Sequence, residues 1–497
     1  MNSLSVGIGT DTQATFGYIK QTSDDRPDYG LPWLGTRPAP VERDRFYGFD
    51  SDYLETDANI LSTQVLHRVS DTLRLDIQAR YADYEREQRI TEPLITPLPP
   101  SGTPPEQMSV YRYVFAGSSD ETLLTTQAVA RFDLGADRVR HALVTGVELA
   151  RESSAPVFAF GDGVPGTSLL DPDSSQPFTA ASLDPRIIAD TEAETAALFA
   201  LDTWKLSDAW HVTLGARWDR FDTEYVADRF AGPPTPFNSG TAAGREAFTQ
   251  VDEVTSYRAA LVYKPVESAS VYLAASTAFN PSSQSLSFLT TGRNLGTENV
   301  SLDPEENESL ELGIKADLVD GRLALSAALF EITKANARIP DPANPGFNTL
   351  GGEQRMRGVS FDVAGMVTER LYLASGYAYL DGEVVRGAAG AAVGAPIANA
   401  PEHSASVWLN YRLTTRFDLG FGARYVGEQF AQSAVNGRMA PSYSVYDAMV
   451  RYGVNDGLAF KLNLTNLTDE FYFEQLHMWH IVPGPGRTAT FAVNAAY

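Results

Sequence analysis

The sequence lacks cysteine, and it lacks any long run of apolar residues. The absence of cysteine excludes disulfides, thiolate metal sites and cysteine nucleophiles. The absence of a run of about 18 apolar residues excludes a transmembrane helix. Long segments with the helical hydrophobic period are also missing, although soluble α/β chains of 497 residues normally contain several. The chain consists instead of many short segments in which apolar and polar residues alternate.

Positive charge is also scarce, because 39 basic residues face 63 acidic ones and give a net charge of −24. Such a surface repels a polyanion, so a nucleic-acid partner is excluded. No Ser–His–Asp spacing, glycine-rich phosphate loop or paired-carboxylate motif stands out among so many acidic residues. The sequence therefore predicts a protein that is not an enzyme.

The first residues, Met1-Asn2-Ser3, do not form a basic segment followed by an apolar one, so no signal peptide is visible. A secreted or outer-membrane protein needs such a segment. If the chain belongs to either class, we expect the N-terminus of the natural protein to be missing from this sequence.

The last forty-odd residues, 452–497, show the alternation most clearly. Apolar residues occupy every second position in residues 458–464 and again in residues 489–497. Period-two alternation places the two sets on opposite faces of a sheet. An apolar strand that ends on an aromatic residue suits a membrane β-barrel, although a soluble β-sandwich produces the same alternation. For a barrel, Phe491, Val493 and Tyr497 are predicted to guide assembly.

Short and long connections alternate along the whole chain. The short ones are 69–72, 134–138, 206–209, 264–267, 319–322, 367–370, 413–416 and 454–457. The long ones lie near 21–52, 90–120, 153–190, 225–250, 281–304, 336–353, 386–400, 430–442 and 469–486. One end of the sheet must then carry turns and the other end loops, as in outer-membrane barrels with short periplasmic turns and long extracellular loops.

Charged residues recur on the polar face of several strands, for example in residues 210–219, 310–318 and 417–425. Unpaired charges do not fit the packed core of a sandwich, whereas a wet lumen accepts them. The sequence therefore predicts an all-β fold, a transmembrane antiparallel β-barrel of about 18 strands preceded by a half strand near residues 4–9. Around residues 329–330 both faces are apolar, which indicates a bulge.

Several stretches resemble TonB-dependent outer-membrane receptors. They are residues 458–473 (LAFKLNLTNLTDEFYF) with PGPGRT at 483–488 and the terminal strand, residues 211–225 (HVTLGARWDRFDTEY) and residues 357–381. Residues 27–32 (PDYGLP), 141–148 (HALVTGVE) and 302–338 are similar to the ferric-siderophore branch, in which the catecholate receptors are the most similar. The resemblance covers essentially the whole chain.

The resemblance implies a barrel of about 22 strands, filled by an N-terminal plug that carries the TonB box. It implies uptake of a ferric siderophore, a catecholate in the most similar branch, with energy from the TonB-ExbB-ExbD complex. Iron enters only as part of the transported chelate, and no cofactor is expected. The implied location is the outer membrane of a Gram-negative bacterium, with outer-membrane lipid and the BAM assembly machinery as further partners. The sequence departs from the family because residues 1–497 contain no plug, no TonB box and no first strands.

Catecholate iron complexes are flat and anionic, so cationic and aromatic loop side chains are the predicted ligand-binding groups. The candidates are Tyr111, Arg112, Tyr113, Arg293, Arg338, His477, Trp479 and His480. Each is also compatible with a loop residue that packs on its neighbours or is solvated.

His477 and His480 form an H-x-x-H pair, but no carboxylate is evident near them in the sequence, so no metal site is predicted. An alternative function for the whole chain is a TonB-independent passive porin of about 18 strands. A membrane hydrolase or adhesin is a further alternative, which the missing catalytic set disfavours.

Overall fold

The computed structural model describes residues 2–136, 139–161, 163–232, 243–281, 302–340, 348–387, 393–434 and 437–495. Regular structure in these ranges is almost entirely β-strand, with one short 3-10 helix, η1 (Pro105–Gln107). No described helix has the length and apolar character needed to cross a membrane. The prediction of an all-β fold is confirmed.

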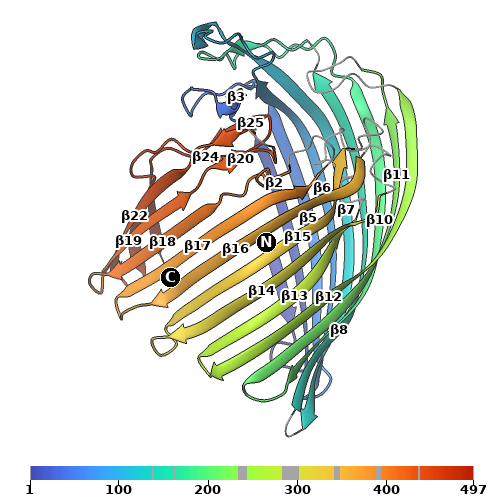
Figure 1. The fold of residues 1–497 in the computed structure, drawn as a ribbon, viewed down its shortest axis with the longest axis vertical. Coiled ribbons are helices and arrows are strands. Elements are labelled where there is room, and N and C mark those ends of the chain that lie inside the picture. Colours follow the sequence, from blue (N-terminus) through green and yellow to red (C-terminus); the bar gives the residue numbers. More distant parts are fainter. Residues whose placement is uncertain are drawn as a thin grey trace.

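Among the residues that the structure describes, twenty strands join into one antiparallel sheet that curves around as a barrel wall (Figure 1). Nineteen of them pair in chain order, and β9 (Thr167–Ser168) adds to β7. The nineteen are β1 (Asn2–Val6), β2 (Thr12–Asp25), β5 (Tyr53–Arg68), β6 (Leu73–Leu94), β7 (Ser109–Ala136), β8 (Val139–Gly161), β10 (Pro185–Lys205), β11 (Trp210–Arg229), β12 (Gly244–Val266), β13 (Ala269–Asn280), β14 (Glu305–Leu318), β15 (Leu323–Pro340), β16 (Asn348–Met366), β17 (Leu371–Arg386), β18 (His403–Arg412), β19 (Phe417–Val426), β22 (Tyr443–Asn455), β23 (Leu458–Thr465) and β26 (Thr488–Ala495).

The strand count agrees with the sequence, because β1 is the expected half strand of five residues and the others are the full strands. Neighbouring strands are antiparallel, so the first and last of nineteen, β1 and β26, run in the same direction. Within the described residues each of these two has a hydrogen-bonded neighbour on one side only. They therefore do not close the sheet as an antiparallel pair with each other.

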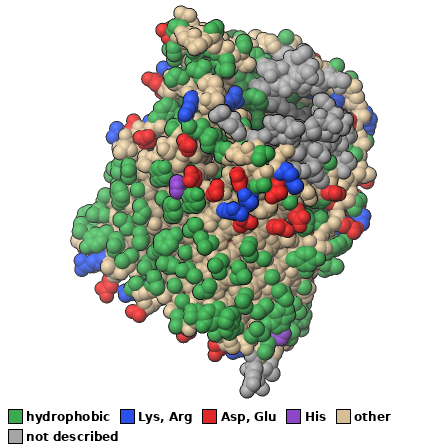
Figure 2. Space-filling model, in the orientation of Figure 1, with side chains coloured by type: hydrophobic (Ala, Val, Ile, Leu, Met, Phe, Trp, Pro, Cys, Tyr) green, Lys and Arg blue, Asp and Glu red, His purple; other side chains and the backbone are tan. Residues whose placement is uncertain are grey.

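Alternation along the strands gives the wall an apolar outer face and a polar inner face. On β14, Leu310, Leu312 and Ile314 are 53%, 48% and 45% exposed, and Glu311 and Lys315 point to the opposite side. Figure 2 shows apolar side chains gathered in a broad band on the outer face, with charged side chains along its borders. This is the surface that a strand wall presents to lipid.

Aromatic side chains mark the end of the wall that carries the turns. Trp210 lies against Tyr263 with ring centroids 4.5 Å apart, and Phe417 lies against Tyr452 at 4.7 Å. Amphipathic rings at one level of a membrane barrel form the girdle at the lipid–water boundary. The turn end therefore lies next to one membrane interface.

The bulge expected around residues 329–330 is not present, and that prediction is wrong. Leu329 pairs with Val359 and Phe330 with Gly358 in an unbroken register. A Cβ at Gly358 would lie 2.3 Å from the Phe330 ring, so the ring occupies the space above the glycine. Glycine thus accommodates an apolar ring on the polar face without a change of register.

The strands extend further at the loop end than the sequence pattern indicates. The connection expected at 90–120 spans only 95–108, and the one expected at 153–190 spans 162–184. The strand extensions include buried apolar residues such as Val110, Val114 and Phe158, which pack against the loop end and do not face lipid. They do not carry the apolar alternation, because it is needed only where a strand faces lipid. At the turn end three boundaries also move, since β7 continues to Ala136, β12 to Val266 and β22 to Asn455, each within the turn expected there.

Several of the long connections that the structure describes fold together over one end of the barrel. Short strands β3 (Leu31–Leu34), β4 (Arg37–Pro38), β24 (Phe473–Leu476) and β25 (His480–Pro483) form a four-stranded sheet, here called the loop-end sheet (Figure 1). β25 pairs with β3, His480 opposite Pro32 and Ile481 opposite Leu31. A second short pair, β20 (Gln429–Phe430) and β21 (Met439–Ala440), lies in the connection after β19.

The loop-end sheet rests on its own hydrophobic core. The core draws on five connections or strand ends, and its fully buried members include Leu31, Val110, Leu169 and Ile481. Burial of each large apolar side chain contributes roughly 1.5–3 kcal/mol. The loop end is therefore a packed structure.

Candidate functional site at the loop end

Arg112, predicted to bind cargo, is completely buried at the start of β7. Its Nε donates to the Tyr47 carbonyl at 2.7 Å, its Nη1 to Gln176 Oε1 at 2.7 Å and its Nη2 to the Asp173 carbonyl at 2.6 Å. The guanidinium also lies 4.3 Å from the centre of the Phe49 ring. Every guanidinium nitrogen of Arg112 therefore bonds to the protein. Arg112 links the connection that contains Tyr47 and the connection that contains Asp173 and Gln176 to the wall.

The tyrosines on either side of Arg112 are also part of the packed structure. Tyr113 is 2% exposed and its ring lies 4.9 Å from Phe115 and 5.6 Å from Phe160. Tyr111 is partly buried at the same strand end. The structure therefore gives the Tyr111–Tyr113 segment little free surface for a ligand, and its binding role stays a prediction.

Two predicted arginines cannot be placed in a site. Arg293 lies outside the described residues. Arg338 lies in β15, opposite Leu350 of β16, and its side chain is outside the described part. Their roles as ligand-binding residues stay predictions.

His477 and His480 come together with an acidic residue from a distant strand. Glu92, at the end of β6, has its Oε1 2.8 Å from His480 Nδ1 and 3.4 Å from His477 Nδ1. The two Nδ1 atoms are 3.2 Å apart. The prediction that no carboxylate lies near the pair is wrong. Glu92 is 388 positions from His480, and no sequence pattern relates them.

The three side chains differ in access to solvent. The side chain of Glu92 is 2% exposed, that of His480 11% and that of His477 51%. Tyr29 covers His480 as a stacked ring with centroids 4.5 Å apart. Burial lowers the pKa of His480, and Glu92 opposes this shift by favouring the imidazolium. The cluster is closed on the His480 side and open to water on the His477 side.

Trp479, between the two histidines, lies under an arginine that the sequence did not single out. The Arg438 guanidinium is 5.3 Å from the centre of the Trp479 ring and donates from Nη1 to the Met478 carbonyl and from Nε to the Gly35 carbonyl. Met478 is 40% exposed at the same turn. Residues 477–479 therefore form a hairpin tip in which His477 and Met478 are exposed, and the partly buried Trp479 ring and Arg438 guanidinium lie beside them.

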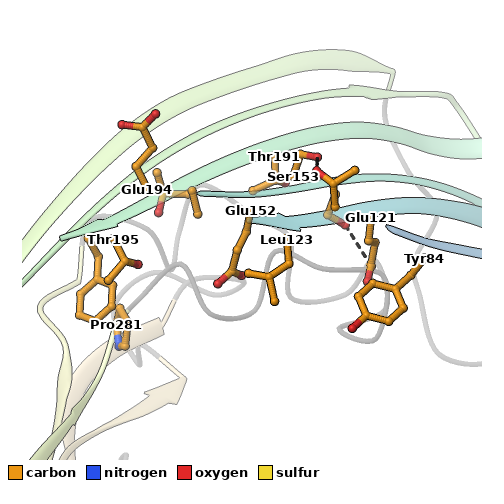
Figure 3. Close-up of a pocket in the computed structure, with 14 residues that line it drawn as sticks. Tyr84, Glu121, Leu123, Glu152, Ser153, Thr191, Glu194, Thr195 and Pro281 are labelled. Carbon is orange, nitrogen blue, oxygen red and sulfur yellow. Dashed lines mark hydrogen bonds between the residues drawn. The ribbon is translucent and has the colours of Figure 1, made fainter. Parts of the chain in front are cut away.

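A hollow of about 420 Å³ lies in the inner face of the wall, between β6, β7, β8, β10 and β11. Figure 3 shows Glu121, Glu152 and Tyr84 directed to one side of the strands, with Glu194 on the opposite side. Glu121 accepts hydrogen bonds from Ser119 Oγ at 2.9 Å and Ser154 Oγ at 3.2 Å. Two carboxylates disfavour an anionic ligand in this hollow, so the hairpin tip is the better candidate.

Two of the three predicted assembly residues lie on the outer face of β26. Phe491 is 64% exposed and Val493 is 56% exposed, and Phe491 stacks on Phe460 with centroids 5.9 Å apart. Tyr497 lies outside the described residues. The apolar face expected for Phe491 and Val493 is present, and the role of all three in assembly stays a prediction.

An antiparallel wall with an apolar outer band, charges inside, turns at one end and a folded loop end defines a barrel of the outer-membrane transport class. Residues 2–467 match the family described as TonB dependent receptor-like, beta-barrel. The chain belongs to this family. It is therefore a receptor and transporter barrel of the Gram-negative outer membrane and not an enzyme.

Curated relatives and solved structures agree with this assignment. The chain is 27% identical over 533 residues to the probable TonB-dependent siderophore receptor PiuA of Acinetobacter baumannii, covering 100% of the chain and 69% of that protein. It is 24% identical to the catecholate siderophore receptor Fiu of Escherichia coli K12, covering 99% and 68%. The crystal structure of PiuA matches with a TM-score of 0.86 at 25% identity, covering 100% of this chain and 73% of that one.

Proposed function

We propose that this chain forms the barrel of a receptor that imports a ferric siderophore, and that the cargo is a catecholate complex. The observation that carries the proposal is the hairpin tip, where the Trp479 ring and the Arg438 guanidinium share one surface at the loop end. A flat aromatic anion suits this surface, because the ring stacks on it and the guanidinium attracts its charge. The names of PiuA and Fiu support the same cargo class.

Import against a gradient needs energy, and we propose that the intact protein receives it from TonB with ExbB and ExbD. Membership in the TonB-dependent family supports this coupling. We likewise propose that the BAM machinery assembles the barrel into outer-membrane lipid, because the outer face of the strands is apolar. The alternative of a passive porin is not favoured by the family match.

Uptake of radioactive iron by cells tests the proposal. The natural full-length protein is expressed in a strain without other siderophore receptors, and iron is supplied as a ferric tris-catecholate, a ferric tris-hydroxamate or ferric citrate. We expect uptake from the catecholate alone, and its loss when tonB is deleted. Equal uptake of all three with tonB deleted would support the porin instead.

The double variant Trp479→Ala, Arg438→Ala locates the ligand surface. We expect roughly a 10-fold to 100-fold loss of catecholate affinity, because stacking and one charge-assisted contact are both removed. Trp210→Ala, at the turn end, is the matched control and should bind as the unchanged protein does. Unchanged affinity in the double variant would place the ligand elsewhere.

A further inference from the structure

We propose that Glu92, His477 and His480 form a binding site for one divalent transition-metal ion, of which Zn²⁺ is the representative. The three side chains place Glu92 Oε1 and two Nδ1 atoms at separations of 2.8, 3.2 and 3.4 Å. One carboxylate and two imidazoles are a donor set that zinc uses in proteins. The site is distinct from the transported iron chelate and does not depend on which cargo the barrel carries.

The separations match those expected around a metal ion. Zinc lies about 2.0–2.2 Å from nitrogen and carboxylate ligands in a tetrahedral arrangement, so two ligand atoms are roughly 3.3 Å apart. The three observed separations lie within about half an ångström of this value. Small side-chain rotations suffice to seat the ion, because His477 is half exposed and free to adjust.

Hydrogen bonds can also hold the three side chains together. Each neutral imidazole has at Nδ1 either one proton or one lone pair. With a proton on His480 Nδ1, this nitrogen donates to Glu92 Oε1 at 2.8 Å, and the lone pair of His477 Nδ1 accepts from the Trp479 backbone N–H at 3.4 Å. A cation at the centre would replace these contacts by binding the lone pairs of all three atoms together, and metal titration distinguishes the two arrangements.

The surroundings of Glu92 also favour a cation. Its carboxylate is 2% exposed, and a buried carboxylate requires a compensating charge. Arg438 lies within electrostatic reach of Glu92, but its hydrogen bonds go to the carbonyls of Gly35 and Met478. Two nitrogen donors select a borderline metal over Mg²⁺ or Ca²⁺, which prefer oxygen ligands.

Metal binding would connect two distant parts of the loop end. Glu92 lies at the end of β6, and the histidines flank the turn between β24 and β25. The ion would therefore fasten the hairpin tip to the wall. The exposed side of His477 leaves space for a fourth ligand, such as water, and gives the ion a path of entry.

Zinc binding to the full chain, purified in detergent and freed of metal with chelator, tests the proposal. We expect equilibrium dialysis without any siderophore to give one Zn²⁺ per chain. His477→Ala and His480→Ala should each weaken binding by at least about 100-fold, because each removes a direct ligand. His403→Ala, which removes an exposed histidine of β18, is the control and should bind zinc normally.

Cobalt provides a readout of geometry. Co²⁺ bound in place of Zn²⁺ should give the intense visible bands of a tetrahedral ion, absent in His477→Ala. Since His477 is half exposed, this variant should retain the heat-modifiable mobility of a folded barrel. Failure of the unchanged protein to bind zinc, or equal binding by His477→Ala and His403→Ala, would overturn the proposal. Either result leaves siderophore uptake as a separate question.

Discussion

The barrel wall and the loop-end sheet are both built from paired strands, yet their sequences specify them differently. In the wall, each strand of the chain-order series pairs with its neighbour in the chain, and the pairing can be followed from turn to turn. In the loop-end sheet, β3 pairs with β25 and the indole N–H of Trp33 donates to the His477 carbonyl, 444 positions away. Local pattern thus determines the wall, whereas long-range packing determines the loop end.

The two regions also face different solvents. Leucines of the wall stay about half exposed because lipid covers them, as on β14. The loop end instead buries Leu31, Leu169 and Ile481 completely, as a protein in water does. We therefore expect the loop end to unfold as a unit of its own, at a lower free energy than the wall.

The largest effect should come from Arg112→Ala. The change leaves the buried carbonyl of Tyr47 and the partly buried carbonyl of Asp173 without the Arg112 donor, and it removes the charge that holds two connections together. We expect a loss of roughly 3–5 kcal/mol in the local stability of the loop end. Hydrogen exchange should show faster opening of β3 and β25 with an unchanged wall. Unchanged exchange in these strands would contradict the proposed role of Arg112.

A charge on the outer face should destabilise the wall. Leu312→Arg places a cation where the strand faces lipid, and we expect a loss of about 2–4 kcal/mol in folding into bilayers. Ser309→Arg, on the inner face of the same strand, is the control and should cost little because it lies in the lumen beside Glu311. Equal losses in the two variants would mean that the assignment of the faces is wrong.

A charge on the outer face of the terminal strand, β26, should also destabilise the barrel, but less than Leu312→Arg does. Phe491→Asp puts a carboxylate on the outer face of β26, and acidic residues cost less there than arginine. We expect slower assembly, measured as the fraction of heat-modifiable barrel in cells, and the same for deletion of Tyr497 or Tyr497→Asp. Thr490→Asp, on the other face of the strand, should assemble normally. Normal mobility in all of these variants would refute a role of the strand in assembly.

The smallest effect should come from the ion pairs of the wall. Arg220 contacts Glu253 at 2.9 Å and Asp222 at 3.3 Å, and its side chain is 43% exposed. Water screens such pairs, so Arg220→Ala should change the unfolding free energy by less than about 1 kcal/mol. A loss of stability as large as that of Arg112→Ala would contradict the account, because it would mean that solvent exposure does not decide how much an arginine contributes to stability.

Sequence alone predicted the wall closely, for a physical reason. Lipid requires an apolar residue at every second position, so strands such as residues 310–318 carry their orientation in their own composition. The pattern ends where the lipid ends. For this reason the strand extensions beyond it, as in β6 up to Leu94, were expected to be loops.

The candidate site was predicted only in part. His477, Trp479 and His480 were found because their residue types are unusual in a loop. The structure places them at one hairpin, where His477 is exposed and His480 is buried. Glu92 and Arg438 were missed, since each belongs to a segment far away in the chain. Arg112 has the residue type of a ligand-binding group, and only its burial reveals a structural role.

Cysteine labelling in intact cells tests the central claim, that the loop end faces outward and carries the ligand surface. Residues 1–497 contain no cysteine, so an engineered cysteine is the one labelling site within them. We expect Met478→Cys to react with a membrane-impermeant maleimide, and a ferric tris-catecholate to slow the reaction. Ser207→Cys, in the turn after β10, should react only after the outer membrane is permeabilised. Labelling of Ser207→Cys in intact cells, or a Met478→Cys rate that the chelate does not change, would contradict the account.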